Sequence, residues 1–116
     1  MEYDPQLELA KQQTAFTNAK AILAIPELQA AVLQGTIDYM GPERAGIEFR
    51  EVPALLEVID IDLGFFRENR GAGYMLWNLL LVNPAIIPPS APEGQTAIAA
   101  ALRQGIHALY NHSAVY

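Results

Sequence analysis

LQGTIDYMGPERAGIEFREVPALLEVIDIDL, residues 33–63, is the stretch around which we expect the rest of the chain to be organised. In residues 36–40, Ile37 and Tyr39 alternate with polar neighbours, and Ile47 and Phe49 do the same in residues 47–50. β-Branched and aromatic residues in alternation with polar ones are typical of half-buried strands. Residues 41–46 hold two glycines and a proline, which suits a longer hairpin loop. The stretch therefore predicts a β-hairpin.

Two helices are expected before the hairpin. Asp4 and Pro5 form a good helix start, because the Asp4 carboxylate can accept from free amides of the first turn and Pro5 lacks a donor. The apolar face of this helix is predicted to include Leu9, Phe16 and Leu23, which recur every seven residues. Pro26 kinks or restarts the helix, and Gly35 fits as the residue past its end.

A third helix is expected from Pro53 to the glycines at 71 and 73. Its apolar stripe is the clearest periodic signal in the chain, and it consists of Val52, Leu55, Leu56, Ile59, Leu63 and Phe66. Helix, hairpin and helix together predict an α+β class that is mainly helical, in a single domain spanning residues 1–116. Residues 1–73 form the helix–β-hairpin–helix core of this prediction.

Residues 74–116 are expected to form an apolar carboxyl-terminal extended arm and a terminal helix. Residues 74–82 are apolar on nearly every side, so periodicity leaves open whether they form a helix or a strand. It also leaves open whether Trp77 belongs to the core or to a subunit interface, since large aromatic side chains dominate both. Residues 83–92 predict an extended, proline-stiffened connector, and residues 95–111 a last helix.

The composition excludes several classes of function. The 116 residues hold no cysteine, so disulfides and thiolate chemistry are absent, and no secretory signal or bilayer-spanning segment is expected. A formal net charge of -6 argues against a protein that grips nucleic-acid phosphates. Hydrophobic residues make up 52% of the chain and charged residues 17%, which predicts apolar surface for a partner.

Reactive chemistry is sparse. His107 and His112 are five residues apart, so they do not share one helical face as a zinc pair requires. Glu57, Asp60 and Asp62 are read as a solvated acidic face rather than a metal site or an acid/base pair. We therefore expect no cofactor and no metal. An enzyme would have to rely on Asp60 together with His107.

The order of elements resembles a known family over residues 19–66. The first helix end at residues 33–35, the strand at 36–40, the apolar-Glu-Phe strand at 47–49 and the helix that follows resemble the gpW-type head-completion proteins of tailed bacteriophages. This resemblance implies a structural virion protein without enzymatic activity. It would form a homo-oligomeric ring in the neck, between portal and tail proteins, with DNA passing through without specific binding and without contact to a membrane.

In such a ring the apolar arm would lie on a neighbouring subunit or on the portal. Our candidate contacts are the exposed hairpin tip and the apolar segment after Gly73, namely Glu43, Arg44, Tyr74, Met75, Leu76, Trp77, Leu80, Ile86 and Ile87. Deletion of residues 74–116 should then abolish the ring and leave the core folded. The alternative function is a small cellular homo-oligomeric binding or regulatory module that uses the same apolar segment.

Overall fold

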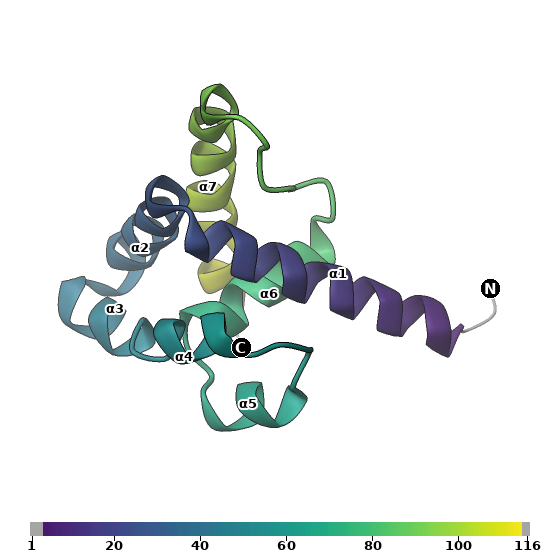
Figure 1. Cartoon of the computed structure of the whole chain (residues 1–116). Helices are drawn as coiled ribbons and strands as arrows, with labels where there is room; N and C mark the ends of the chain where they lie inside the picture. The colour runs from purple at the N-terminus through teal and green to yellow at the C-terminus, as the bar shows by residue number, and fades with distance from the viewer. Residues whose placement is uncertain (1–3, 115–116) are drawn as a thin grey trace.

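The computed structural model is built from helices alone over the part of the chain that it describes, which is the backbone of residues 4–114 and the side chains of residues 4–111. Residues 1–3, in the amino terminus where we expect no secretory signal, and residues 115–116 lie outside it. In chain order the helices are α1 (Pro5–Ala24), α2 (Pro26–Met40), α3 (Pro42–Glu48), α4 (Val52–Glu57), α5 (Leu63–Glu68), α6 (Ala72–Val82), the 3-10 turn η1 (Pro92–Gly94) and α7 (Gln95–Ala114) (Figure 1). The predicted α+β class is wrong, since residues 4–114 contain no strand.

The two helix starts near the amino terminus are confirmed. The Asp4 carboxylate accepts hydrogen bonds from the amides of Gln6 and Leu7, at 3.0 and 3.3 Å. Ile25 is extended, with φ −93° and ψ 116°, and Pro26 begins α2. Both helix starts are set by a capping side chain or a proline within a few residues of the start, so they can be recognised from the local sequence.

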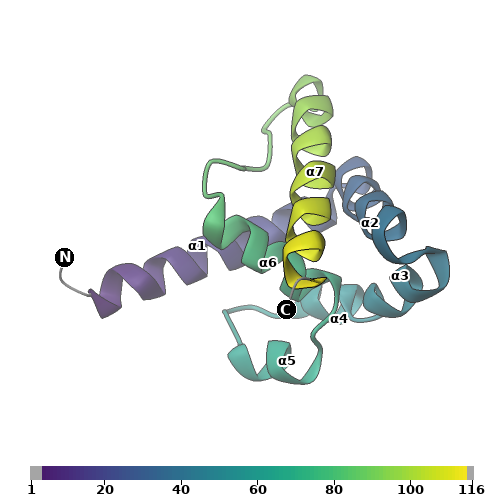
Figure 2. The ribbon, with the colours of Figure 1, turned by 180° about the vertical axis from the view of Figure 1, so that it is seen from behind.

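The predicted strand at residues 36–40 is wrong, because α2 continues to Met40. Leu28, Val32 and Thr36 recur every four residues and are all buried, so they form one helical face. The Thr36 hydroxyl donates to the Val32 carbonyl at 2.9 Å and is thereby satisfied inside the core. Gly35 lies within the helix rather than past its end, and α7 packs along α2 on this side (Figure 2).

The predicted hairpin loop and second strand, residues 41–46 and 47–50, are also wrong. Gly41 has φ +86° and ends α2, and Pro42 then begins α3 with its fixed φ. Helical hydrogen bonds join the Ala45 amide to the Gly41 carbonyl at 3.1 Å and the Phe49 amide to the Ala45 carbonyl at 3.0 Å. A glycine followed by a proline therefore marks a junction between two helices here.

The long third helix is interrupted between residues 58 and 62. Val58 is extended after α4, and the Asp62 carboxylate accepts from the Phe65 amide at 3.1 Å to cap α5. The Lys20 ammonium donates to the Val58 carbonyl and holds the interruption against α1. The periodic stripe therefore does not lie on one face, and Ile59 is 91% exposed.

Residues 74–82, for which the sequence left helix and strand open, lie in the helix α6. The glycines at 71 and 73 flank its beginning rather than end the previous helix. The core is one hydrophobic cluster that runs from Ala15 to Tyr110 and draws on both halves of the chain, so α6 and α7 are part of it. Residues 83–91 of the predicted connector form no helix or strand, but its last residue, Pro92, begins η1. Within residues 4–114, no helix combines the length and apolar character that crossing a membrane requires.

The first half of α1 extends beyond this core. We call residues 5–14 the overhang, because every buried residue of α1 lies at or after Ala15. Figures 1 and 2 show the overhang pointing away from the other helices. Leu7 and Leu9 are 52% and 49% exposed on it, so the expected burial of Leu9 in the apolar face of α1 is wrong.

Candidate functional site

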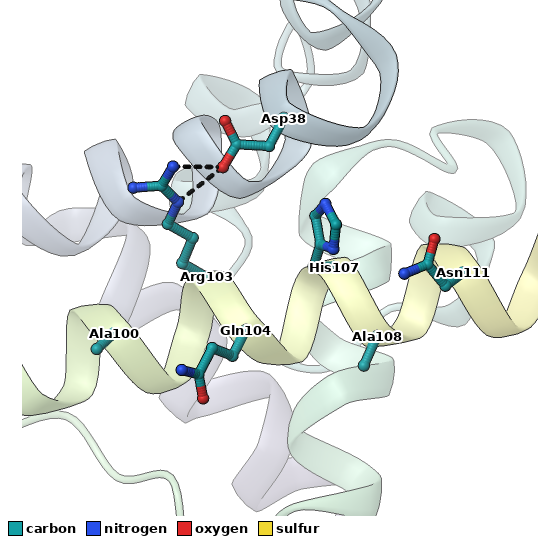
Figure 3. Close-up of a pocket in the computed structure, with 7 residues that line it drawn as sticks. All are labelled: Asp38, Ala100, Arg103, Gln104, His107, Ala108 and Asn111. Carbon is teal, nitrogen blue, oxygen red and sulfur yellow. Dashed lines mark hydrogen bonds and ion pairs between the residues drawn. The ribbon is translucent and has the colours of Figure 1, made fainter.

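A hollow of about 580 Å³ lies where α7 passes α2, and we call it the polar hollow because five of its seven lining residues have polar side chains. Six of its lining residues come from α7 and one from α2; they are Ala100, Arg103, Gln104, His107, Ala108, Asn111 and Asp38 (Figure 3). The helical spacing of these α7 residues places them on one side of that helix. The hollow is broad and open rather than enclosed.

The Asp38 carboxylate has both oxygens engaged. Its Oδ2 accepts from Nη2 and Nε of Arg103, at 2.6 and 2.7 Å, and its Oδ1 accepts from Nε2 of Gln34 at 2.9 Å (Figure 3). The hydrogen bond from Gln34, followed by the hydrogen bond and charge of Arg103, lowers the pKa of Asp38 below 3.8. A carboxylate held ionised in this way is a poor proton acceptor at neutral pH.

His107 contributes an imidazole to the hollow. Its imidazole points from α7 toward the α2 side, where Asp38 lies (Figure 3). The ring also meets Tyr39 edge-on, with centroids 6.3 Å apart and planes at 89°. Among the residues that line the hollow there is no Ser, Thr, Cys, Lys or Tyr that could act as a nucleophile beside it. The charged residues of the hollow form a bridge between two helices, since Asp38 of α2 pairs with Arg103 of α7.

The acidic residues considered from the sequence lie elsewhere. Asp60 is exposed in the 58–62 interruption and lines none of the described hollows, so it shares no cavity with His107. Glu57 is exposed on α4, and Asp62 serves as the cap of α5. The side chain of His112 lies outside the described residues. Among the side chains of residues 4–111, no three His, Asp or Glu groups converge as a metal site.

The predicted contact residues fall into three groups. Leu76, Trp77 and Leu80 are buried in the core of the chain itself. Trp77 stacks on Phe66 at a centroid distance of 4.9 Å, and its Nε1 donates to the Gln12 carbonyl at 3.1 Å. Of the two environments left open for Trp77, it therefore occupies the core.

The remaining predicted contacts are accessible to different degrees. Tyr74, Met75 and Ile86 are half-buried, and Ile87 is 58% exposed in the connector. Glu43 and Arg44 are exposed, but they lie in the first turn of α3 and not at a hairpin tip.

A second hollow was not foreseen from the sequence. It holds about 310 Å³ between the overhang and the end of α6, and we call it the overhang groove. Its walls are largely apolar and consist of Leu7, Ala10, Lys11, Thr14, Ala15, Asn18, Leu80, Leu81 and Pro84. The sequence gives one sign of it, since Leu7 lies off the stripe of Phe16 and Leu23, which faces the core. A leucine outside the core-facing stripe indicates a second apolar face.

No protein-family model matches the chain, and no curated protein or solved structure is significantly similar to it. The resemblance to the head-completion proteins therefore stays a prediction.

Proposed function

We propose that the protein is a non-enzymatic subunit that acts by associating with further copies of itself. The observation that carries this proposal is the overhang. Most of the stability of protein helices comes from tertiary packing, and the overhang has little of it, since every buried residue of α1 lies at or after Ala15. Packing against another chain would stabilise it. The overhang offers two exposed leucines and an apolar groove for such packing.

The polar hollow supports the same conclusion. Asp38, the carboxylate that could serve as a base there, is committed to Arg103 and Gln34. Asp60 and His107, the pair an enzyme would need, lie in separate places. A protein that works through its surfaces fits this distribution of groups better than one that works through proton transfer.

This proposal agrees with the homo-oligomeric module considered as an alternative from the sequence. A ring in the neck of a virion stays a prediction, and it loses the strands on which the resemblance depended, since residues 36–40 lie in α2 and residues 47–48 in α3. Deletion of residues 74–116 is no longer a useful test. That deletion removes α6 and α7 from the core and should unfold the chain.

The test is the mass of the intact chain in solution. Sedimentation equilibrium from about 1 to 300 μM should give masses rising above the 12.7 kDa of one chain. The matched variant begins at Lys11, which removes most of the overhang and keeps the Gln12 carbonyl that Trp77 uses. It should remain folded by near-ultraviolet circular dichroism and stay monomeric. A wild-type mass of 12.7 kDa throughout the range would contradict the proposal.

A further inference from the structure

Residues 59–70, which carry the short helix α5, are fixed to the rest of the chain at their two ends. Val58, at one end, accepts a hydrogen bond from the Lys20 ammonium of α1. Gly71, at the other end, lies so close to α3 that a Cβ atom there would overlap the Glu48 carbonyl oxygen. Figures 1 and 2 show α5 set apart from the other helices, and within residues 4–114 it packs along none of them.

The hydrogen bonds of residues 59–70 stay inside this segment and its ends. The amides of Phe65 and Phe66 both reach Asp62, and the amide and side chain of Asn69 both reach the Phe65 carbonyl. In the described part of the chain, no hydrogen bond or ion pair joins the segment to a residue before 58 or after 71. The segment can therefore leave the core without breaking a hydrogen bond to it.

A single buried side chain fastens the segment to the core. Phe66 is 2% exposed, whereas the other residues of the segment are exposed, apart from the half-buried Ile61, Phe65 and Asn69. Regions with few buried apolar contacts open locally at a lower free energy than the whole chain unfolds. The contacts of Phe66 therefore decide how often the segment opens.

The Phe66 ring fills a recess whose walls are aromatic rings of α1 and α6. It stacks on Trp77 with centroids 4.9 Å apart and planes at 15°, and it meets Phe16 and Tyr74 edge-on at 5.6 and 5.8 Å. Both are favoured geometries for aromatic pairs. The walls do not depend on α5, because α1 packs against α6 and Trp77 donates to the Gln12 carbonyl at 3.1 Å.

We infer that residues 59–70 form a flap that opens about its fixed ends while the other helices stay folded. The Phe66 ring is the latch of this flap. Opening breaks the contacts of Phe66 and of its half-buried neighbours, whereas global unfolding must also separate α2 from α7 and α1 from α6. The open flap uncovers the recess, which then accepts one aromatic ring from outside in place of Phe66.

Amide hydrogen exchange distinguishes a flap from global unfolding. The protection factors of the Phe66 and Asn69 amides should be at least tenfold below that of Leu80 in α6. They should also stay constant in low urea, because opening the flap exposes little surface, while the protection of Leu80 should fall as urea is added. If all three amides have the same protection and the same dependence on urea, the segment opens only when the chain unfolds, which overturns the inference.

Phe66→Leu and Ile106→Val form a matched pair, since both change a buried apolar side chain and only the first lies in the flap. Phe66→Leu should lower the protection of the Asn69 amide at least threefold, because it weakens the latch. Ile106→Val should lower the protection of Leu80 and change that of Asn69 less than twofold, because Ile106 on α7 stays buried when the flap opens. The inference is overturned if Phe66→Leu leaves Asn69 unchanged, or if Ile106→Val lowers the protection of both amides equally.

Benzyl alcohol tests the recess, because it carries the ring of Phe66 with a hydroxyl group where the main chain would leave. It should raise the melting temperature of Phe66→Ala by about 2–4 °C at ten times its dissociation constant. Cyclohexylmethanol is the control, since it is similar in size but has no aromatic face, and it should raise the melting temperature less than half as much. Equal effects of the two alcohols, or none, would show that the recess does not select an aromatic ring.

The wild-type chain gives the same test if Phe66→Ala does not fold. Benzyl alcohol that binds only where the Phe66 ring has left should favour the open flap and lower the protection of the Asn69 amide at least twofold, with Leu80 changed less. Cyclohexylmethanol should change the protection of Asn69 less than benzyl alcohol does. An Asn69 amide whose protection is the same with and without benzyl alcohol would overturn the binding of a ring in the recess.

Discussion

The Glu51 carboxylate accepts a hydrogen bond from the backbone amide of Gly73 at 2.7 Å, so a residue just before α4 caps the start of α6. Helix starts leave amides without partners, and a carboxylate also interacts favourably with the helix dipole there. Glu51 can come this close to the start of α6 because Gly71 and Gly73 have no side chains. A Cβ atom at Gly71 would overlap the Glu51 carboxylate, and one at Gly73 would overlap Leu55.

Gly73→Ala should therefore destabilise the fold. The added methyl group would overlap a terminal methyl group of the buried Leu55, whose side chain would have to shift, and such overpacking costs about 1–3 kcal/mol. The free energy of unfolding in urea measures this loss. Gly46→Ala is the matched control, since nothing lies within 4 Å of its Cβ position in α3. It should stabilise the chain by about 0.5–1 kcal/mol through helix propensity. Equal effects at the two glycines would contradict the cap geometry.

The Glu51 cap should also make stability depend on pH. Burial, partly offset by the hydrogen bond from Gly73, raises the pKa of Glu51 above 4.5. A carboxyl group whose pKa is raised by folding stabilises the folded chain fully below its unfolded pKa, and this contribution is lost as the pH rises through the folded pKa. From pH 4.5 to 7 the wild type should therefore lose stability relative to Glu51→Gln, which keeps an acceptor without the charge.

Urea midpoints at each half pH unit over that range measure this difference. The control is Glu57→Gln, which removes an exposed carboxylate from α4. If the urea midpoints of the wild type and Glu51→Gln differ by the same amount at every pH, folding does not change the pKa of the Glu51 carboxyl group. That result would contradict the prediction.

Local signals in the sequence were enough to predict where several helices begin. Asp4 and Pro26 act on amides and dihedral angles within their own turn, so no knowledge of the fold is needed. The strand predicted for residues 36–40 is wrong for the opposite reason. Their β-branched and aromatic side chains favour a strand locally, but a buried face of α2 and its contact with α7 favour a helix, and tertiary packing overrides weak propensities.

Gly35 shows how one residue supports two interpretations. A glycine after an apolar stripe predicts a helix end. In the fold it lies where α7 crosses, and a Cβ atom there would come within 3.2 Å of the Arg103 carbonyl oxygen. Close helix contact and a helix end both favour glycine, and only the position of α7 distinguishes them. The overhang was unpredictable for a similar reason, because the periodicity of α1 does not show where its covering helices stop.

The ion pair between Asp38 on α2 and Arg103 on α7 predicts how a substitution changes the pKa of Asp38. Arg103→Gln should raise the pKa of Asp38 toward 3.8, because it removes both contacts from Arg103 together with its positive charge, while the hydrogen bond from Gln34 remains. Titration of the Asp38 carboxyl carbon by NMR measures this shift. Arg67→Gln on α5 is the control and should leave the titration unchanged. An unmoved Asp38 titration in Arg103→Gln would show that the ion pair does not form in solution.

Tyr110 on α7 should tolerate the loss of its hydroxyl group. The hydroxyl is buried with no hydrogen-bond partner among the described residues, and burial, with the negative charge of Glu48 next in effect, raises the pKa of Tyr110 to about 12. Leaving such a group unpaired costs about 1–3 kcal/mol. Tyr110→Phe removes that cost and keeps the ring stacked on Tyr39, whose centroid is 4.9 Å away.

The free energy of unfolding of Tyr110→Phe should therefore exceed that of the wild type by about 1 kcal/mol. Tyr39→Phe is the control, because its ring is half-buried in the same stack and its hydroxyl is not among the buried groups without a partner. It should change stability by less than about 0.5 kcal/mol. A loss of stability in Tyr110→Phe would show instead that the hydroxyl donates to an acceptor, with Thr36 as the candidate. In that case Thr36→Val should cause a similar loss, since it removes the same acceptor.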